Sequence, residues 1–178
     1  VKPFPLAKQP HAGLKKIVRE KQKGRASSRL HESMGERMNN RAYRAHWPQD
    51  IQDDIVHNEY NGMVGSVLVS ETEDLRVWHL HIPAGERCAF HRHVLDYFWT
   101  CHSHGESRSY FEDGSIKDAK YQPGSTRHFS FRKGEYLLHS VENIGQETLL
   151  FTTVEFKRSA NPPLPVSDSI RLTEGIAS

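Results

Sequence analysis

The segment GERCAFHRH, residues 85–93, decides the fold, because it ends in two histidines one residue apart. On a β-strand successive side chains point to opposite faces, so His91 and His93 share one face, about 7 Å apart along the chain. That spacing lets two imidazoles approach the same cation. A third histidine, His139, follows a turn-like segment at residues 132–135 and opens a new apolar run. The sequence therefore predicts a metal site with two ligands from one strand and one from another.

Short β segments surround these histidines. From about residue 54 to residue 157, runs of β-branched and aromatic residues alternate with turn signals such as Pro83-Ala84-Gly85. Several short strands without intervening helices are typical of an all-β barrel or sandwich. The predicted strands are 63–70, 75–82, 89–101, 108–111, 128–131, 136–141 and 148–156. We predict a barrel domain at residues 49–160, an N-terminal arm at 1–48 and a C-terminal extension at 161–178.

Length and composition fit one domain with an arm. The chain has 178 residues, of which 36% are hydrophobic, enough for one core and too few for two full domains. It contains no apolar stretch of the roughly 18 residues that span a membrane, and its N-terminus lacks an apolar signal core. We therefore expect a cytoplasmic protein without membrane contact. The two cysteines, Cys88 and Cys101, are expected to be reduced thiols.

Charge is distributed unevenly along the chain. Residues 1–45 carry twelve Lys or Arg against three acidic residues, whereas the rest carries twelve basic against nineteen acidic residues. A basic arm can bind nucleic acid, but this one lacks interleaved aromatic residues and any nucleic-acid-binding motif. The favoured interpretation is that the arm, with short helical pieces at 14–19 and 35–44 before Pro48, lies on the acidic surface of its own domain or of a second subunit. We expect a homodimer, because the edge strands of such a barrel need cover.

The motifs resemble the two conserved blocks of the cupin superfamily. Gly85 is followed at the expected distance by His91-x-His93, and a later glycine-containing turn precedes His139-x3-Asn143. Residues 74–157 are similar, more narrowly, to small single-domain cupins of the conserved-barrel type that are named after β-alanine degradation clusters. The resemblance implies an all-β fold, a double-stranded β-helix or jelly-roll barrel, with a divalent metal held in the barrel by His91, His93 and His139.

The chain departs from the cupin pattern at two places. A glutamate usually follows the second histidine by four or five residues, and here Tyr97 and Phe98 stand at those positions. Asp96 is expected on the opposite face of the strand. Gly134 and Tyr136 replace the proline and glycine that usually precede the last histidine. The resemblance therefore implies a three-histidine site without a carboxylate ligand.

Cupins with three histidines and open coordination positions include non-haem iron dioxygenases. The resemblance thus implies an Fe(II) dioxygenase that acts on a small polar or aromatic acid. A zinc or nickel ion in the same ligands would instead support an isomerase or lyase, and a non-catalytic cupin that binds a small ligand is a third alternative. In the enzyme, Tyr97 would donate a proton or a hydrogen bond, and Arg132 or Arg87 would pair with a substrate carboxylate; the alternative for either arginine is a solvated surface charge. Trp99 would face the barrel interior, as core or as a wall of the substrate site.

The remaining histidines are weighed against this site. His79 and His81 are expected at the surface or in contact with a metal ligand. Unlike His91 and His93, they do not follow a glycine at the spacing of the cupin pattern. His102 and His104 have the opposite parity from His91 on an uninterrupted strand, so they face outward unless a bulge intervenes. His128 is expected in the barrel wall, at the surface or in contact with a metal ligand. Glu155, late on the last strand, is a further candidate acid or base on which the prediction does not rely.

Overall fold

The computed structural model describes residues 43–172, which belong to one compact unit, residues 39–178. The helical piece expected at 14–19, all but the end of the piece at 35–44 and the last residues of the C-terminal extension lie outside the described residues. No helix within residues 43–172 is long and apolar enough to cross a membrane.

The described part of the chain folds into nine strands, one α-helix and one short 3-10 helix. The strands are β1 (Val67–Glu71), β2 (Leu75–Ile82), β3 (Arg87–His93), β4 (Asp96–Cys101), β5 (Gly105–Phe111), β6 (Ile116–Tyr121), β7 (Thr126–Phe129), β8 (Leu137–Asn143) and β9 (Leu149–Phe156). The helices are α3 (Gln49–His57) and η1 (Asp168–Ile170).

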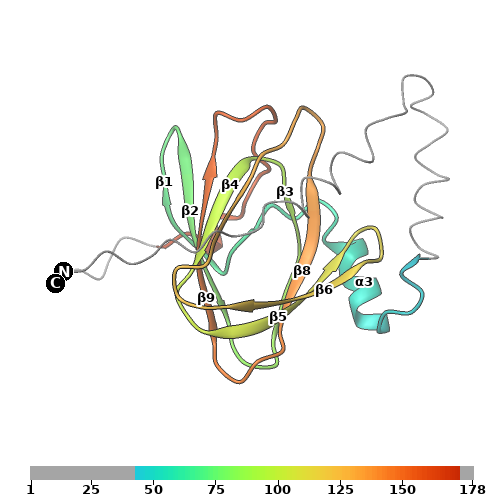
Figure 1. Ribbon diagram of the computed structural model, residues 1–178. Coiled ribbons are helices and arrows are strands. Elements are labelled where there is room, and N and C mark those ends of the chain that lie inside the picture. The colour runs from blue at the N-terminus through green and yellow to red at the C-terminus, as the bar shows by residue number, and fades with distance from the viewer. Residues whose placement is uncertain (1–42, 173–178) are drawn as a thin grey trace, which may run out of the picture. The chain divides into compact units, whose positions relative to one another are not determined.

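The strands form two antiparallel sheets that enclose an interior (Figure 1). One sheet has the order β1-β2-β9-β4-β7, and the other has the order β3-β8-β5-β6. Apart from the β1/β2 and β5/β6 hairpins, consecutive strands lie in opposite sheets, which is the strand order of a jelly roll. The predicted all-β, double-stranded β-helix fold is therefore confirmed.

The segment predicted as one strand at 89–101 is two strands in different sheets. The chain leaves β3 after His93, and the buried Leu95 lies in the crossover to β4. Tyr97 is nevertheless buried on the interior side, as the alternation from His93 predicts, because the crossover preserves the parity.

Two elements have no counterpart among the predicted ones. Strand β6 was not predicted because its sequence, IKDAKY, is mostly exposed and contains no apolar run. Helix α3 was not predicted because it buries only Ile51 and Ile55, one helical turn apart. That helix covers the outer side of the four-stranded sheet through a buried cluster, which consists of Trp47, Ile51, Ile55, Phe90, Tyr110 and Leu138.

The loop before β8 is fixed by a side chain from the C-terminal extension. The amide of Asn161 donates to the carbonyls of Val94 and Arg132 at 3.0 Å and of Glu135 at 3.2 Å, and its oxygen accepts from Gly134 N at 2.7 Å. Gly134 has a φ of 81°, which favours glycine over any side chain with a Cβ. This clamp ties the start of β8 to the end of β3, the two strands that carry the histidines.

Candidate metal centre

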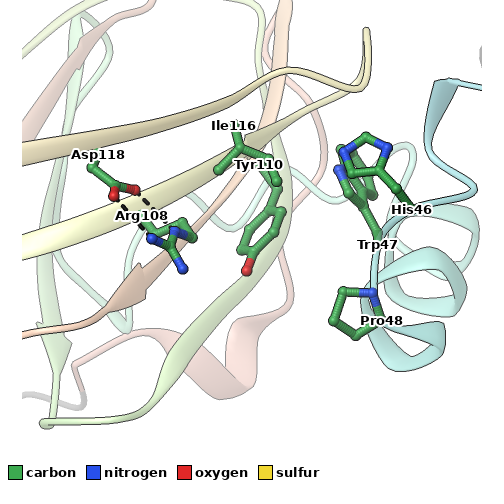
Figure 2. Close-up of a pocket in the computed structure, with 7 residues that line it drawn as sticks. All are labelled: His46, Trp47, Pro48, Arg108, Tyr110, Ile116 and Asp118. Atoms are coloured by element: carbon green, nitrogen blue, oxygen red, sulfur yellow. Dashed lines mark hydrogen bonds and ion pairs between the residues drawn. The ribbon is translucent and has the colours of Figure 1, made fainter.

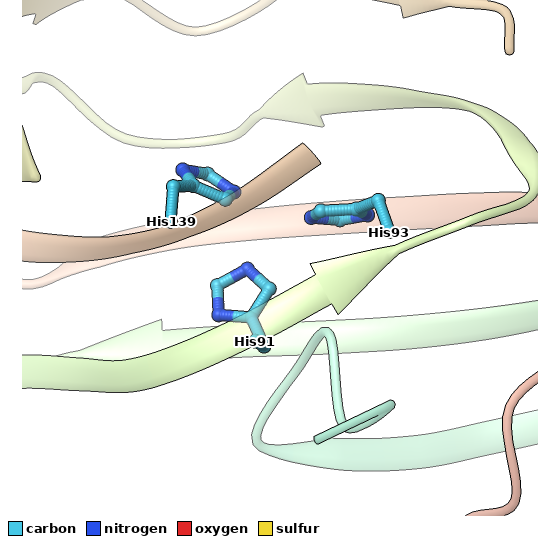
Figure 3. Close-up of side chains that lie close together, drawn as sticks. All are labelled: His91, His93 and His139. Carbon is cyan, nitrogen blue, oxygen red and sulfur yellow. The ribbon is translucent and has the colours of Figure 1, made fainter. Parts of the chain in front are cut away.

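Three histidines converge in the barrel interior (Figure 3). His91 and His93 lie on β3, and His139 is the direct cross-strand partner of His91 on β8. One potential ligand atom from each ring lies within 4.8 Å of the others. No carboxylate or thiol belongs to this group. Within residues 43–172, no other group of three or more potential metal-ligating side chains is found. The structure thus brings together the two-plus-one set that the sequence predicted.

Burial keeps these imidazoles neutral. His91 and His93 are 2% and 3% exposed, and desolvation lowers the pKa of each of the three histidines from its usual value. Neutral imidazole is the form that binds a metal ion. The Nδ1 atom of His91 lies 2.9 Å from the carbonyl oxygen of Ala89 and donates to it as the protonated nitrogen. His91 Nε2 is left as the ligand atom.

Unpaired ring nitrogens indicate that the site fits a metal. His93 Nδ1 and both ring nitrogens of His139 are buried without a hydrogen-bond partner. A buried polar atom without a partner costs about 1–3 kcal/mol, so such atoms gather where a ligand can satisfy them. Three neutral imidazoles are a donor set that suits a divalent transition metal. The neighbouring Cys88 does not belong to this group, although its sulfur lies 3.6 Å from His91 Nδ1. Burial raises the pKa of the Cys88 thiol to about 12.

Tyr97 lies directly against this group. Its ring stacks on His93 with a centroid distance of 4.1 Å and on Phe129 with a distance of 4.5 Å. Burial, and then the nearby charge of Glu155, hold the pKa of the phenol well above its usual range. Tyr97 therefore remains protonated and can donate a hydrogen bond or a proton.

Glu155 is a buried carboxyl next to Tyr97. It is the cross-strand partner of Tyr97 on β9, and it accepts a hydrogen bond from Trp78 Nε1 at 2.9 Å. Burial raises the pKa of Glu155 to about 7, although the Trp78 hydrogen bond acts in the opposite direction. A carboxyl with this pKa can both accept and release a proton near neutral pH.

Aromatic side chains form the walls around these groups. Phe111 on β5 stacks on His139 with a centroid distance of 5.7 Å, and Trp99 packs edge-on against Tyr121 and Phe151. Trp99 thus faces the interior, as its spacing from Tyr97 predicted. Phe111 was missed in the sequence, although it lies on a predicted strand. Knowing its register against His139 would have identified it.

The structure does not bring Arg87 to the histidines. A bulge between Cys88 and His91 shifts the register of β3, so Arg87 points to the outer side and pairs with Asp54 of α3. Asp54 also accepts a hydrogen bond from Phe90 N at 3.0 Å. Arg132 is exposed in the turn that precedes β8, where its backbone N–H binds Glu135.

The other polar residues weighed for the site lie apart from it. Asp96 accepts a hydrogen bond from Phe131 N at 2.8 Å, and His102 binds the Thr152 hydroxyl at 2.8 Å. The ring of His128 packs on Phe98, on the opposite side of β4 from Tyr97. Neither these residues nor His79, His81 and His104 join the three-histidine group in the described part of the chain.

A groove of about 570 Å³ lies on the outer side of the four-stranded sheet, away from the histidines (Figure 2). Arg108 and Asp118 pair with each other there through two hydrogen bonds of 2.9 Å. The lining residues are His46, Trp47, Pro48, Arg108, Tyr110, Ile116 and Asp118. The mutual neutralisation of this pair leaves the groove without a free charge from either residue.

Three of the solved structures with similar folds each cover about half of this chain. A cupin domain from Bordetella pertussis Tohama I is 21% identical, with a TM-score of 0.45, over 52% of this chain and 94% of that one. A double-stranded β-helix protein from Klebsiella pneumoniae subsp. pneumoniae MGH 78578 is 25% identical, with a TM-score of 0.42, over 57% and 76%. An RmlC-like cupin from Methanocaldococcus jannaschii is 21% identical, with a TM-score of 0.42, over 51% and 76%. No family model and no curated protein matches the chain.

The fold is assigned from the order of the strands in this chain. Eight strands, β2 to β9, form the two four-stranded layers of a jelly roll, with β1 added at one edge. His91, His93 and His139 stand inside this barrel, where the cupin blocks in the sequence predicted them. The chain therefore has a double-stranded β-helix fold that encloses a three-histidine site suited to a divalent metal.

Proposed function

We propose that this protein is a three-histidine, Fe(II)-dependent dioxygenase that acts on a small polar or aromatic acid. One observation carries the proposal: three neutral imidazoles, of the buried His91 and His93 and the half-buried His139, converge without a carboxylate among the described residues. Three protein ligands leave coordination positions open for small molecules, whereas a structural site is closed by its ligands. An iron(II) ion held by these histidines would supply the binding and activation of dioxygen beside the substrate.

The residues around the histidines support this chemistry. The stacked rings of Tyr97 and Phe129 on one side, and of Phe111 on the other, place apolar surface beside the histidines. Such surface would keep water away from a bound substrate. Tyr97 holds a proton on its phenol beside His93. It can donate that proton as a hydrogen bond to a substrate oxygen, which orients the substrate and stabilises developing negative charge.

A second candidate is a zinc- or nickel-dependent isomerase or lyase. The observation that favours it is the pair of Glu155 and Tyr97, which are cross-strand partners in the buried interior. A carboxyl with a pKa of about 7 is suited to move a proton from or to a substrate carbon without any oxidant.

Metal analysis of protein purified without an affinity tag tests the proposal. We expect about one iron per chain in the unmodified protein, and a loss of at least tenfold in the His91→Ala and His139→Ala variants. His102→Ala is the matched control, because that histidine binds Thr152 outside the group and should leave the metal content unchanged. Oxygen uptake is then measured with thiols, β-diketones and hydroxybenzoates.

The outcomes separate the candidates. Iron together with substrate-dependent oxygen uptake supports the dioxygenase. Zinc or nickel in the same stoichiometry, with turnover in the absence of oxygen, moves the function to the second candidate. Protein that binds no metal under any condition, but binds small ligands, would leave a non-catalytic cupin and overturn both.

A further inference from the structure

We propose that the outer face of the five-stranded sheet binds a second copy of this chain and forms a symmetric homodimer. The outer face consists of the residues on β1, β2, β9, β4 and β7 that point away from the barrel interior. On β2, every second residue from Arg76 to Ile82 is buried. The residues between them, such as His79 and His81, are exposed or half-buried on the outer face.

The two sheets differ in what covers their outer sides. Helix α3 packs on the four-stranded sheet through the Trp47 cluster, and Figure 1 shows it on the side away from β1 and β2. No α-helix among residues 43–172 packs on the five-stranded sheet. Leu150 and Phe156, on the middle strand β9, are 41% and 42% exposed. Exposed apolar side chains gathered on one sheet mark an interaction surface.

The middle of the outer face carries an apolar row. Val77 on β2, Val154 on β9 and Phe98 on β4 are direct cross-strand neighbours, so their side chains lie side by side. The Phe98 ring also contacts Phe156 and His128, with centroid distances of 6.1 Å and 5.3 Å. Removal of such aromatic and aliphatic surface from water drives association.

A row of hydroxyl groups lies beside the apolar row. Thr152, Thr100 and Thr126 are neighbours on β9, β4 and β7. The Thr100 and Thr126 hydroxyls lie 2.9 Å apart, and His102 binds the Thr152 hydroxyl at 2.8 Å. A hydroxyl both donates and accepts hydrogen bonds, and a neutral imidazole has one donor and one acceptor. Groups of this kind can pair with copies of themselves, as a two-fold interface requires.

The lack of charge on the outer face favours a second copy as its partner. Charged residues make up 26% of the chain, but among the outer positions of β2, β9 and β4 only Asp96 is charged. Asp96 stands at the start of β4 and accepts a hydrogen bond from Phe131 N. Two copies of this face therefore meet without like-charge repulsion, whereas a strongly charged partner would find no counter-charge.

The outer face is large enough for a specific dimer. Five strands about 4.8 Å apart, with about 3.3 Å per residue along each strand, make a surface of roughly 20 Å by 25 Å. Two such surfaces would bury about 1,000 Å² in total, which reaches the lower bound for a specific interface.

Sedimentation equilibrium of the full-length protein tests the dimer. We expect the unmodified protein to be dimeric, and Leu150→Glu and Thr152→Glu each to weaken the dimer by about tenfold or more, because each brings two like charges together. Ile116→Glu is the matched control, since Ile116 is also 41% exposed but lies on β6 of the other sheet. Thr152→Ser retains the hydroxyl and should dimerise like the unmodified protein. Thermal unfolding checks that each variant is folded.

Salt concentration separates this dimer from one held together by the N-terminal arm. Residues 1–45 carry twelve basic and three acidic residues, so association of this arm with an acidic surface would weaken as salt screens the charges. We expect the Kd of the dimer to change by less than about threefold between about 50 and 500 mM salt. A monomeric unmodified protein, a dimer left intact by both glutamate variants, equal weakening by Ile116→Glu, or strong weakening by salt would overturn the proposal. None of these results bears on the metal content or on oxygen uptake.

Discussion

His139 and Asn143 stand four residues apart on the inner side of strand β8. Asn143 is buried and His139 is half-buried with both ring nitrogens buried, but only Asn143 has hydrogen-bond partners for its side-chain polar atoms. The Asn143 amide donates to the carbonyls of Ile82 and Glu147 at 2.8 Å, and its oxygen accepts from Gly145 N at 3.0 Å. Neither ring nitrogen of His139 has a partner. Because the polar atoms of the Asn143 side chain are hydrogen-bonded within the protein, that end of the interior is structural. The ring nitrogens of His139 have no hydrogen-bond partner, which indicates a ligand site at the other end.

The surroundings of the two residues differ in the same way. Near Asn143 the interior is an apolar cluster of Leu80, Ile82, Cys101, Val141, Leu149 and Phe151. Near His139 lie titratable groups whose pKa values all move toward the uncharged form, down for the histidines and up for Tyr97 and Glu155. Burial therefore removes charge from the histidine end and leaves neutral donors and acceptors there.

Asn143→Leu should have the largest effect on folding. The substitution removes the Asn143 partner of the buried Ile82 carbonyl and of the partly buried Glu147 carbonyl and Gly145 N–H, and loss of a buried partner costs about 1–3 kcal/mol. We expect the free energy of unfolding to fall by about 4 kcal/mol in a urea titration. A change below about 1 kcal/mol would contradict the structural role given to this end of the interior.

Glu155→Gln should have the next largest effect, with the opposite sign and with a dependence on pH. The pKa of Glu155 rises from 4.5 to about 7 on folding, mainly through burial. Between these two pH values the unfolded chain ionises and the folded protein does not, so stability falls as pH rises and stays lower above pH 7. Glutamine removes this loss. We expect the variant to be more stable than the unmodified protein at pH 8, by an amount on the order of 3 kcal/mol, and equal to it near pH 4.

Urea titrations of metal-free protein across pH 4 to 8 check the Glu155 prediction. Glu71 provides an internal contrast. Burial acts to raise its pKa, but hydrogen bonds from Arg76, Arg171 and Lys157 outweigh that effect and lower the pKa to about 2. Stability that depends on Glu71 is lost as pH falls from about 4.5 toward 2, so the two windows do not overlap. An identical pH dependence of Glu155→Gln and the unmodified protein between pH 4.5 and 7 would sink the prediction.

Ile82→Val tests whether the two ends are independent. Ile82 is 2% exposed in the apolar cluster, and removal of one methylene group from such a position costs about 1 kcal/mol. We expect that loss in thermal unfolding together with an unchanged metal affinity. A metal affinity reduced by about tenfold or more would show that packing around Asn143 also positions the histidines.

Much of the fold was predictable from the alternation of side chains between the two faces of each strand. Residues 75–82 form a strand as predicted, and His91 and His93 share the inner face because the period of two holds between them. Strand β6 was missed because its inward residues include Lys117, a charge on the inner side that conceals any apolar pattern. The clamp by Asn161 was also missed, since it joins segments far apart in the sequence.

The candidate site was predictable where side chains alternate regularly between the two faces of a strand. Tyr97 and Trp99 face the interior as expected, whereas Arg87 does not, because the bulge between Cys88 and His91 reverses the side of every residue before it. A bulge leaves no signature in residue type here, so the sequence could not reveal it.

His139→Leu should have the smallest effect on folding and the most informative one. Leucine fills a comparable volume and removes two buried nitrogens that have no hydrogen-bond partner, so the lost packing on Phe111 is offset by the relieved desolvation. In metal-free protein we expect a free energy of unfolding equal to that of the unmodified protein or higher by about 1 kcal/mol. Added metal should raise the Tm of the unmodified protein and leave that of the variant unchanged, because a ligand that binds the folded state stabilises it. Asn143→Leu also introduces leucine on strand β8. A large loss of unfolding free energy in that variant, with no loss in His139→Leu, would show that the histidine is retained for binding and not for folding. Destabilisation of metal-free His139→Leu by about 3 kcal/mol or more would mean instead that the imidazole is a structural part of the core.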